Sequence, residues 1–516
     1  MVEKVDKVII TNFGALDAKY GTGVAQIHAA LAQLVQADNN RGLVTAIIAV
    51  DDATVMQGFN GLVVTDAQDC AQNKQAIDDI YRAYAPDYLV ILGSIDVIPH
   101  QDMKNPLFVA GSDDPDEFAF GDLPYACDAP YSQDISDFKG PSRVVSRLPD
   151  QTGAQDPQPL LDLLEEVIQH QPRPRSDYHD DHAVSAAIWQ LSSQQSAHNM
   201  FGSQGNLQLV PLQGRPWPHA HLMRRVHFYN CHGGINDPRF FGQPANGAKI
   251  YPEALRSSDL AGNVASGTVV AAECCYGGQL YATSALQPEA PTCNRYLEAG
   301  AIGMWASTTI AYGAVFGNSQ ADLITQYFII NALKGASLGR AALEARQSFV
   351  LAASPAGPDD LKTLAQFNLY GDASITPVAT PAPAQAPAGV DHAIAERAMR
   401  VDRRLALARQ GGSLAVSEPN LARSDEPASE QVLAQLRAHV AEGEERITNV
   451  LSFRLRFRES RIESFALKAA EEASDGYVVG FVDVPRPDDV PVRPVKLVVG
   501  RVQAGQVVQI STVVSR

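Results

Sequence analysis

The sequence GTVVAAECCYGG, residues 267–278, decides the fold that we expect for this chain. Residues 268–272 are an apolar run with two adjacent valines, which is typical of a buried strand in a parallel sheet. The run ends at Glu273, after which come Cys274, Cys275, a tyrosine and two glycines. A strand that ends in this way places a thiol at the carboxyl edge of the sheet, where open α/β sheets hold their ligands.

A second stretch has the same design. Residues 226–230, VHFYN, are strand-like, and they run directly into Cys231, His232, Gly233 and Gly234. If the two strands are neighbours, their carboxyl ends present an imidazole and a thiol to one crevice. The sequence therefore predicts a Cys/His pair at the edge of a parallel sheet.

A cysteine nucleophile needs a group that manages protons and donors that stabilise an oxyanion. Cys275 is suited to attack a carbonyl carbon, and His232 to protonate the leaving amine and to hold a water for deacylation. The backbone N–H of Gly233 is the expected oxyanion donor, because a glycine lets the chain approach a substrate closely. The N–H of Cys275 itself is the second candidate donor.

These two blocks resemble the caspase–haemoglobinase clan of cysteine peptidases, and within it the gingipain-like family. Three further blocks agree in kind, LVILGSIDVIP at 89–99, ASTT at 306–309 and FNLYGD at 367–372. The resemblance covers about residues 5–377 and not the tail. It implies a caspase-like α/β fold, with a mostly parallel sheet flanked by helices in two α/β subdomains, and it implies a thiol peptidase.

Two cysteines compete for the role of nucleophile. The clan places an acidic or amide residue two positions before the nucleophile and a glycine soon after it. Cys275 fits this pattern, with Glu273 in the acidic position. Cys274 would put Ala272 there, as gingipains themselves do, so Cys275 is preferred and Cys274 stays open.

The resemblance also implies a substrate preference. In clan members the residue two before the nucleophile lines the S1 pocket, and an acid there accompanies basic P1 residues. A carboxylate in a narrow pocket favours arginine through charged, bidentate hydrogen bonds. Glu273 therefore predicts cleavage after Arg or Lys. By analogy with the family, Ser307 and Thr309 form the facing wall and Tyr312 the rim.

Composition bounds the remaining possibilities. The chain of 516 residues is too long for one ordinary core. A net charge of −17 argues against nucleic acid as a partner. We find no apolar run long enough to cross a membrane and no signal peptide. The six cysteines lack the spacing of a disulfide framework, which favours a reducing, cytoplasmic setting.

Alternation of strand-like and helical patterns divides the chain into four parts. They are an N-terminal α/β subdomain (1–150), a catalytic α/β subdomain (151–377), a Pro/Ala linker with a helix (378–428) and a small α+β C-terminal domain (429–516). The helical pattern after the linker ends near Gly411 and Gly412, and the segment 102–140 is expected to be irregular. The tail carries no catalytic constellation.

The same residues also allow structural interpretations in place of catalytic ones. Both cysteines can be small buried hydrophobes. A zinc site would combine His227, Cys231, His232, Cys274 and Cys275, although their spacing matches no familiar zinc module. A structural calcium ion would be held by Asp113, Asp114, Asp116 and Glu117, which lack the spacing of an EF-hand. We expect no cofactor.

The function expected from these observations is a cysteine endopeptidase that acts through an acyl-thioester on Cys275. Its partner is a protein or peptide substrate. Control by the tail, or by a regulatory partner bound to the C-terminal domain, would prevent unwanted proteolysis in the cell. The alternative is a catalytically silent, caspase-like protein that binds a peptide or a partner.

Overall fold

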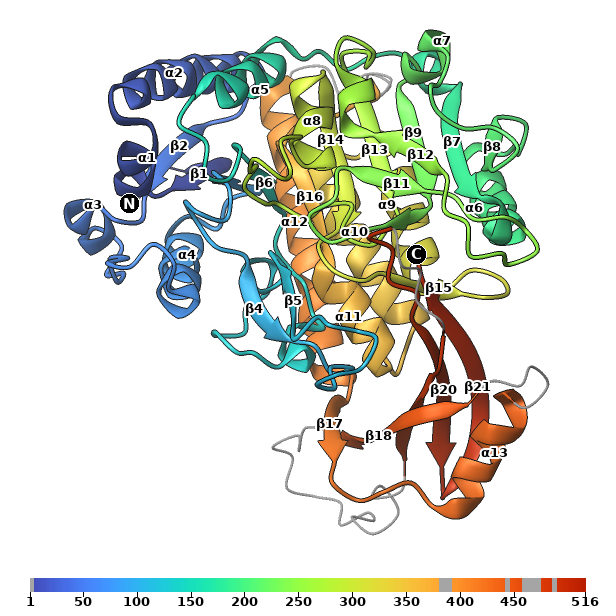
Figure 1. Ribbon diagram of the computed structural model, residues 1–516. Coiled ribbons are helices and arrows are strands. Elements are labelled where there is room, and N and C mark those ends of the chain that lie inside the picture. The colour runs from blue at the N-terminus through green and yellow to red at the C-terminus, as the bar shows by residue number, and fades with distance from the viewer. Residues whose placement is uncertain (1–3, 380–391, 441–445, 457–474, 485–489) are drawn as a thin grey trace, which may run out of the picture.

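A ten-stranded, mostly parallel sheet forms the centre of the protein (Figure 1). The computed structural model describes residues 4–379, 392–440, 446–456, 475–484 and 490–516. In spatial order the strands are β2 (Thr45–Ala49), β1 (Lys7–Thr11), β3 (Tyr88–Leu92), β6 (Val145–Leu148), β16 (Phe367–Gly371), β14 (Ala301–Ser307), β13 (Thr268–Ala272), β9 (Val226–Asn230), β7 (Asp181–Ala186) and β8 (Leu207–Val210).

The sheet has two parallel halves that run in opposite directions. Strands β2 to β16 pair in parallel, and so do strands β14 to β8, whereas β14 and β16 pair antiparallel. The two expected α/β subdomains are thus halves of one continuous sheet. Strands β13 and β9 are neighbours, so their carboxyl ends meet at one edge, as the sequence predicts.

Helices flank this sheet (Figure 1). Helices α2, α5 and α8 pack in sequence against one another, and α6, α9 and α10 form a second group. The helices of this part are α1 (Phe13–Tyr20), α2 (Val24–Asn40), α3 (Ala53–Gln57), α4 (Cys70–Tyr84), α5 (Gln158–Gln169), α6 (Gln190–Phe201), α7 (His219–Leu222), α8 (Thr292–Glu298), α9 (Gln320–Leu333), α10 (Leu338–Ala352) and α11 (Pro358–Gln366). The predicted α/β class is confirmed. No helix of the described residues is both long and apolar enough to cross a membrane.

The C-terminal part adds a second, antiparallel sheet of six strands. In order these are β15 (Tyr312–Ala314), β21 (Gln506–Ser515), β20 (Lys496–Gln503), β19 (Gly476–Val482), β18 (Ile447–Arg456) and β17 (Asn420–Ser424), and α13 (Glu430–Val440) packs on β20 and β21. Its first strand, β15, comes from the part of the chain that is predicted to be catalytic. The second sheet is therefore joined by strand pairing to the part that carries the predicted site.

The segment predicted to be irregular contains regular structure. Strands β4 (Gln101–Lys104) and β5 (Phe118–Gly121) pair antiparallel across a long connection. Each has only four residues, too few for a periodic pattern to stand out among the surrounding Asp, Gly and Pro. All six cysteines of the chain are free thiols, and the cytoplasmic setting stays a prediction.

Helix α12 (His392–Ser417) continues through Gly411 and Gly412, where the sequence predicts an end. The predicted linker before it lies mostly outside the described residues. The reason for the continuation is packing: a Cβ at Gly411 would overlap the backbone carbonyl of Pro141, whereas a Cβ at Gly412 would meet nothing within 4 Å. Gly411 thus lets the helix lie directly on the loop before β6.

This difference gives a prediction with a matched control. Gly411→Ala and Gly412→Ala make the same gain of about 1 kcal/mol in helix propensity. Only the first forces a Cβ into backbone, which costs roughly 1–3 kcal/mol. We expect a lower melting temperature for Gly411→Ala and an unchanged or higher one for Gly412→Ala, measured by circular dichroism. Equal melting temperatures would contradict this packing.

Candidate active site

The His232 and Cys275 loops lie against each other at the carboxyl edge of β9 and β13. Strand β10 (His232–Gly233) follows β9 and pairs with β11 (Arg239–Phe241), which pairs with β12 (Glu253–Arg256). A Cβ at Gly233 would overlap the carbonyl oxygen of Cys275. The glycine is required for this close approach. The structure thus brings into contact the two loops that carry the three residues predicted as catalytic.

The hydrogen bonds around His232 define which ring nitrogen is available. Its Nε2 lies 2.9 Å from Oε1 of Gln243. The Gln243 amide nitrogen donates to the carbonyls of Gly247 and Ala248, both at 3.3 Å, which fixes the orientation of the amide. Nε2 therefore carries the proton and Nδ1 the lone pair. Nδ1 is buried without a hydrogen-bond partner among the described residues, so it is the nitrogen left for proton transfer.

Two aromatic rings enclose the imidazole. Trp189 lies 4.4 Å from it between ring centroids, and Tyr251 lies 5.2 Å away. Burial lowers the pKa of His232 to about 3, and the nearby cation of Arg516 acts in the same direction. The imidazole is therefore neutral near pH 7 in this state, and it is a weak base for as long as the site stays buried.

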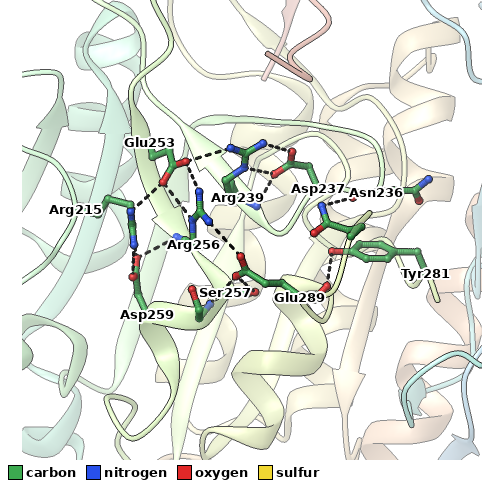
Figure 2. Close-up of polar contacts among 12 residues, drawn as sticks. Arg215, Asn236, Asp237, Arg239, Glu253, Arg256, Ser257, Asp259, Tyr281 and Glu289 are labelled. Atoms are coloured by element: carbon green, nitrogen blue, oxygen red, sulfur yellow. Dashed lines mark hydrogen bonds and ion pairs between the residues drawn. The ribbon is translucent and has the colours of Figure 1, made fainter. Parts of the chain in front are cut away.

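An ion-pair network fixes the small β10–β11–β12 sheet (Figure 2). Glu253 of β12 accepts from all three arginines of the network, Arg215, Arg239 and Arg256. Each arginine has a second carboxylate: Asp259, Asp237 and Glu289, respectively. Because β11 leads into the Gln243 turn, the network stabilises the loop that orients His232.

The Cys275 backbone and thiol both meet the backbone of Arg516, the residue that follows strand β21. The N–H of Cys275 donates to the carbonyl oxygen of Arg516 at 3.0 Å. The thiol lies 3.6 Å from the carbonyl oxygen of Ala311, which also accepts the Arg516 N–H at 2.9 Å. The donor expected as the second candidate for an oxyanion, the Cys275 N–H, thus holds a carbonyl oxygen. Burial raises the pKa of the Cys275 thiol to about 12.

Cys274 faces the other way. Its sulfur lies 4.0 Å from the carbonyl oxygen of Tyr229 in the neighbouring strand, and burial together with Cys231 raises its pKa well above the ordinary value. Cys274 is thus packed inside the sheet edge, and Cys275 is the thiol beside Arg516.

The side chain of Arg516 lies in a buried pocket that shares Trp189 with the His232 ring. Its Nη2 lies 3.1 Å from both carboxylate oxygens of Asp322 and 3.1 Å from the carbonyl of Ala314. The guanidinium stacks over Trp189 at 4.5 Å, and Ser192 lies 3.5 Å from it. The Arg516 side chain is fully buried. The pocket therefore offers an acid and an aromatic face to a planar cation.

Asp322 is the functional residue that sequence reasoning missed. It stands three positions after Ser319, and the two side chains form the capping box of α9. In a sequence, S-x-x-D before an apolar helix indicates a helix start and nothing more. The same carboxylate that caps the helix also points into the Arg516 pocket.

Glu273, predicted as the acid of this pocket, is fully buried beside Asp322 and Arg516, and its carboxyl group lies close enough to Asp322 for a hydrogen bond between the two acids, which requires a proton on one of them. Burial and the neighbouring Asp322 raise its pKa well above the ordinary value. Glu273 is thus a neutral acid next to the ion pair, and the pocket holds one negative charge for one cation.

The structure places the predicted pocket wall elsewhere. Ser307 donates to the carbonyl of Thr309 at 2.9 Å, and the Thr309 hydroxyl bonds to Gln366. The Thr309 carbonyl accepts the N–H of Tyr276 at 3.1 Å. Ser307 ends β14, Thr309 follows it, and both support the Cys275 loop, whereas the Arg516 side chain contacts Trp189, Ser192, Ala314 and Asp322.

Tyr312, predicted as the rim, contributes its backbone. As the first residue of β15 it pairs with Ser515 of β21. Its hydroxyl donates to buried Asp114 at 2.7 Å, away from the Arg516 pocket.

Two of the acids considered for calcium form an internal ion cluster. Lys362 lies 2.7 Å from Asp114 and 3.0 Å from Asp116. Asp116 also accepts from the Tyr276 hydroxyl and the Ile310 N–H, both at 2.8 Å. One ammonium thus pairs with both carboxylates, and the calcium site stays a prediction. Within the described part of the chain, no group of three His, Cys, Asp or Glu is placed to hold a metal.

Comparison with known proteins finds likeness in structure only. No protein-family model matches the chain, and no curated protein matches it. The Arg-specific cysteine proteinase gingipain R is similar at a TM-score of 0.48 and 10% identity, over 99% of this chain and 98% of that one. A second solved structure, described as a protease, has a TM-score of 0.45 and 13% identity over 98% and 97%. The Saccharomyces cerevisiae separase–securin complex aligns at 0.29 and 13% identity, over 45% of this chain and 14% of that one.

The buried thiol leads to a prediction for alkylation by iodoacetamide. The thiolate is the reacting species, so with a pKa near 12 the rate at Cys275 rises about tenfold per pH unit from about pH 7 to about pH 10. In the urea-unfolded chain the thiol pKa is about 8.5, and the rate levels off above it. Peptide mass spectrometry at Cys275 measures both profiles. A native profile that levels off near pH 9 would contradict the buried, neutral thiol.

Proposed function

We propose that this chain is a cysteine endopeptidase that cleaves after arginine, and more slowly after lysine, with Cys275 as nucleophile and His232 as general acid and base. The observation that carries the proposal is the position of Arg516. Its carbonyl oxygen is held by the Cys275 N–H, and its guanidinium is paired with Asp322. An arginine residue of a peptide therefore lies where a P1 residue would lie.

The proposed reaction starts with transfer of the Cys275 proton to Nδ1 of His232. The thiolate attacks the P1 carbonyl carbon, and the negative oxygen of the tetrahedral intermediate is stabilised by the Cys275 N–H. The C–N bond breaks as His232 donates its proton to the leaving amine, which gives the acyl-thioester. Water then loses a proton to Nδ1 and attacks the thioester, releasing the P1 carboxylate and the thiol.

The pocket favours arginine over lysine for two reasons. A guanidinium is planar and stacks on Trp189, and its Nη2 reaches both Asp322 and the Ala314 carbonyl while the ring face stays covered. An ammonium has neither property. Discrimination between the two is therefore proposed to come from Trp189, Asp322 and Ala314, and not from Glu273 alone.

Activity is proposed to be conditional. The thiol and imidazole are both buried and both neutral in this state, and the groove is filled by the chain's own C-terminal strand. Control by a partner that binds the C-terminal domain stays a prediction. The same burial favours the alternative, a silent peptide-binding protein, and the next experiment separates the two.

Substitution of each cysteine in turn tests the nucleophile. We expect Cys275→Ala to abolish hydrolysis of an arginyl peptide, a loss of roughly 1,000-fold or more. Cys274→Ala removes a sulfur of the same size from the next residue and should keep most activity. Fluorogenic assays and thermal melts measure both. Activity retained in Cys275→Ala would reject the mechanism, and no cysteine-dependent activity under any condition would favour the silent protein.

A second pair of variants tests the acid that binds P1. Asp322→Asn removes the charge paired with the guanidinium, and we expect kcat/KM for arginyl substrates to fall roughly 100-fold. Glu273→Gln replaces a neutral acid by a neutral amide of the same shape and should change kcat/KM only a few-fold. If Glu273→Gln has the larger effect, the P1 partner is Glu273 and the assignment made from the structure is wrong.

A further inference from the structure

The end of β21 lies along β15 as an added antiparallel strand. Residues Val513, Val514 and Ser515 pair with Ala314, Gly313 and Tyr312 in that order. In Figure 1 the C-terminus lies beside β15, below β11. Strand addition to a short edge is a common way in which proteins bind extended peptides. Counted back from Arg516, this segment occupies the positions of P1 to P4 residues.

The fit at Arg516 is specific for its shape. A Cβ at Gly313 would overlap the guanidinium, so a glycine is needed in the pocket wall. Burying an arginine is costly unless its charge is paired. If this strand end only packed one sheet against another, an apolar residue at its end would be more stable than an arginine. The pairing with Asp322 and the contact with the Cys275 N–H are what a bound P1 arginine requires.

The other edge of this segment is held by the C-terminal domain. Ser515 donates its N–H to the carbonyl of Val495 at 2.9 Å, and its hydroxyl accepts from the Val495 N–H and donates to the Arg493 carbonyl, both at 2.9 Å. A free peptide would have only the β15 edge. Because the segment is tethered, it also competes as an intramolecular ligand at a high effective concentration.

A second piece of the C-terminal domain covers the His232 loop. Val492 forms an antiparallel bridge with Gly234, and a Cβ at Gly234 would lie 2.7 Å from Pro491. Val492 also packs with Phe241 and with Tyr251, whose ring contacts His232. Both loops of the candidate site are therefore closed by the same domain.

We propose that residues 513–516 are a tethered pseudosubstrate, which occupies the peptide-binding site and keeps the peptidase inactive. Their sequence, Val-Val-Ser-Arg, then indicates the class of peptide that binds when the segment has left. The class is an extended segment with arginine at P1, a small residue at P2 and β-branched residues at P3 and P4. The expected effect on hydrolysis rests on the proposed function, whereas the expected effect on peptide binding does not.

Kinetics test the closure. The substrate is acetyl-Val-Val-Ser-Arg with a fluorogenic amide, and the proteins are the full chain, Arg516→Ala and a chain stopped at Thr512. We expect kcat/KM to rise roughly tenfold or more in both altered chains, because substrate no longer competes with a tethered ligand. Val508→Ala, an exposed change in the same strand, is the control and should leave kcat/KM unchanged. Cysteine-dependent hydrolysis at equal rates in the full chain and in folded Arg516→Ala would overturn the inference.

Binding tests it without catalysis. In a Cys275→Ala background, fluorescence anisotropy follows a labelled Val-Val-Ser-Arg peptide. We expect affinity to rise roughly tenfold or more when Arg516→Ala is added, and to be lost again with Asp322→Asn. Equal affinity with and without Arg516→Ala would overturn the pseudosubstrate. If binding follows the expected pattern but no variant hydrolyses the substrate, the inference stands and the peptidase proposal fails.

Discussion

The close approach of the His232 and Cys275 loops is the constraint on which the site depends. Two neighbouring parallel strands deliver the loops to one edge, and Gly233 lets them touch because a side chain there would overlap the Cys275 carbonyl. Any larger residue would push the two loops apart. The arginine pocket, the Gln243 hydrogen bond and the ion network around Glu253 all build on this contact.

The buried acidic residues around the site have different roles. Asp322 caps a helix and binds a guanidinium, Glu273 stays neutral beside it, and Asp114 and Asp116 both pair with Lys362. Each acid lies in a region of low water content, where a charge without a partner would be costly. The environment, more than the residue type, sets the role of each carboxyl group.

The sequence was informative where chemistry and periodicity coincide. Strands β9 and β13 have the predicted bounds, because an apolar run that ends in His-Gly or Cys-Cys is both a strand and a site. It was uninformative where one residue serves two purposes or where contacts join distant segments. Asp322 looks like a helix cap, and nothing in the sequence around Arg516 indicates a pocket 194 residues earlier in the chain. Ser307 and Thr309 were assigned by analogy, and their hydroxyls support the cysteine loop instead.

Strand β15 has only three residues, Tyr312–Ala314, and in the closed state its outer edge is fully used by β21. Should that partner leave, the edge would expose a few unpaired peptide groups, enough to hold one short ligand. Longer and flatter exposed strand edges promote aggregation, because they can pair with the strands of other molecules. Because β15 is so short, a molecule whose β21 segment has left this edge would stay monomeric until a peptide binds there.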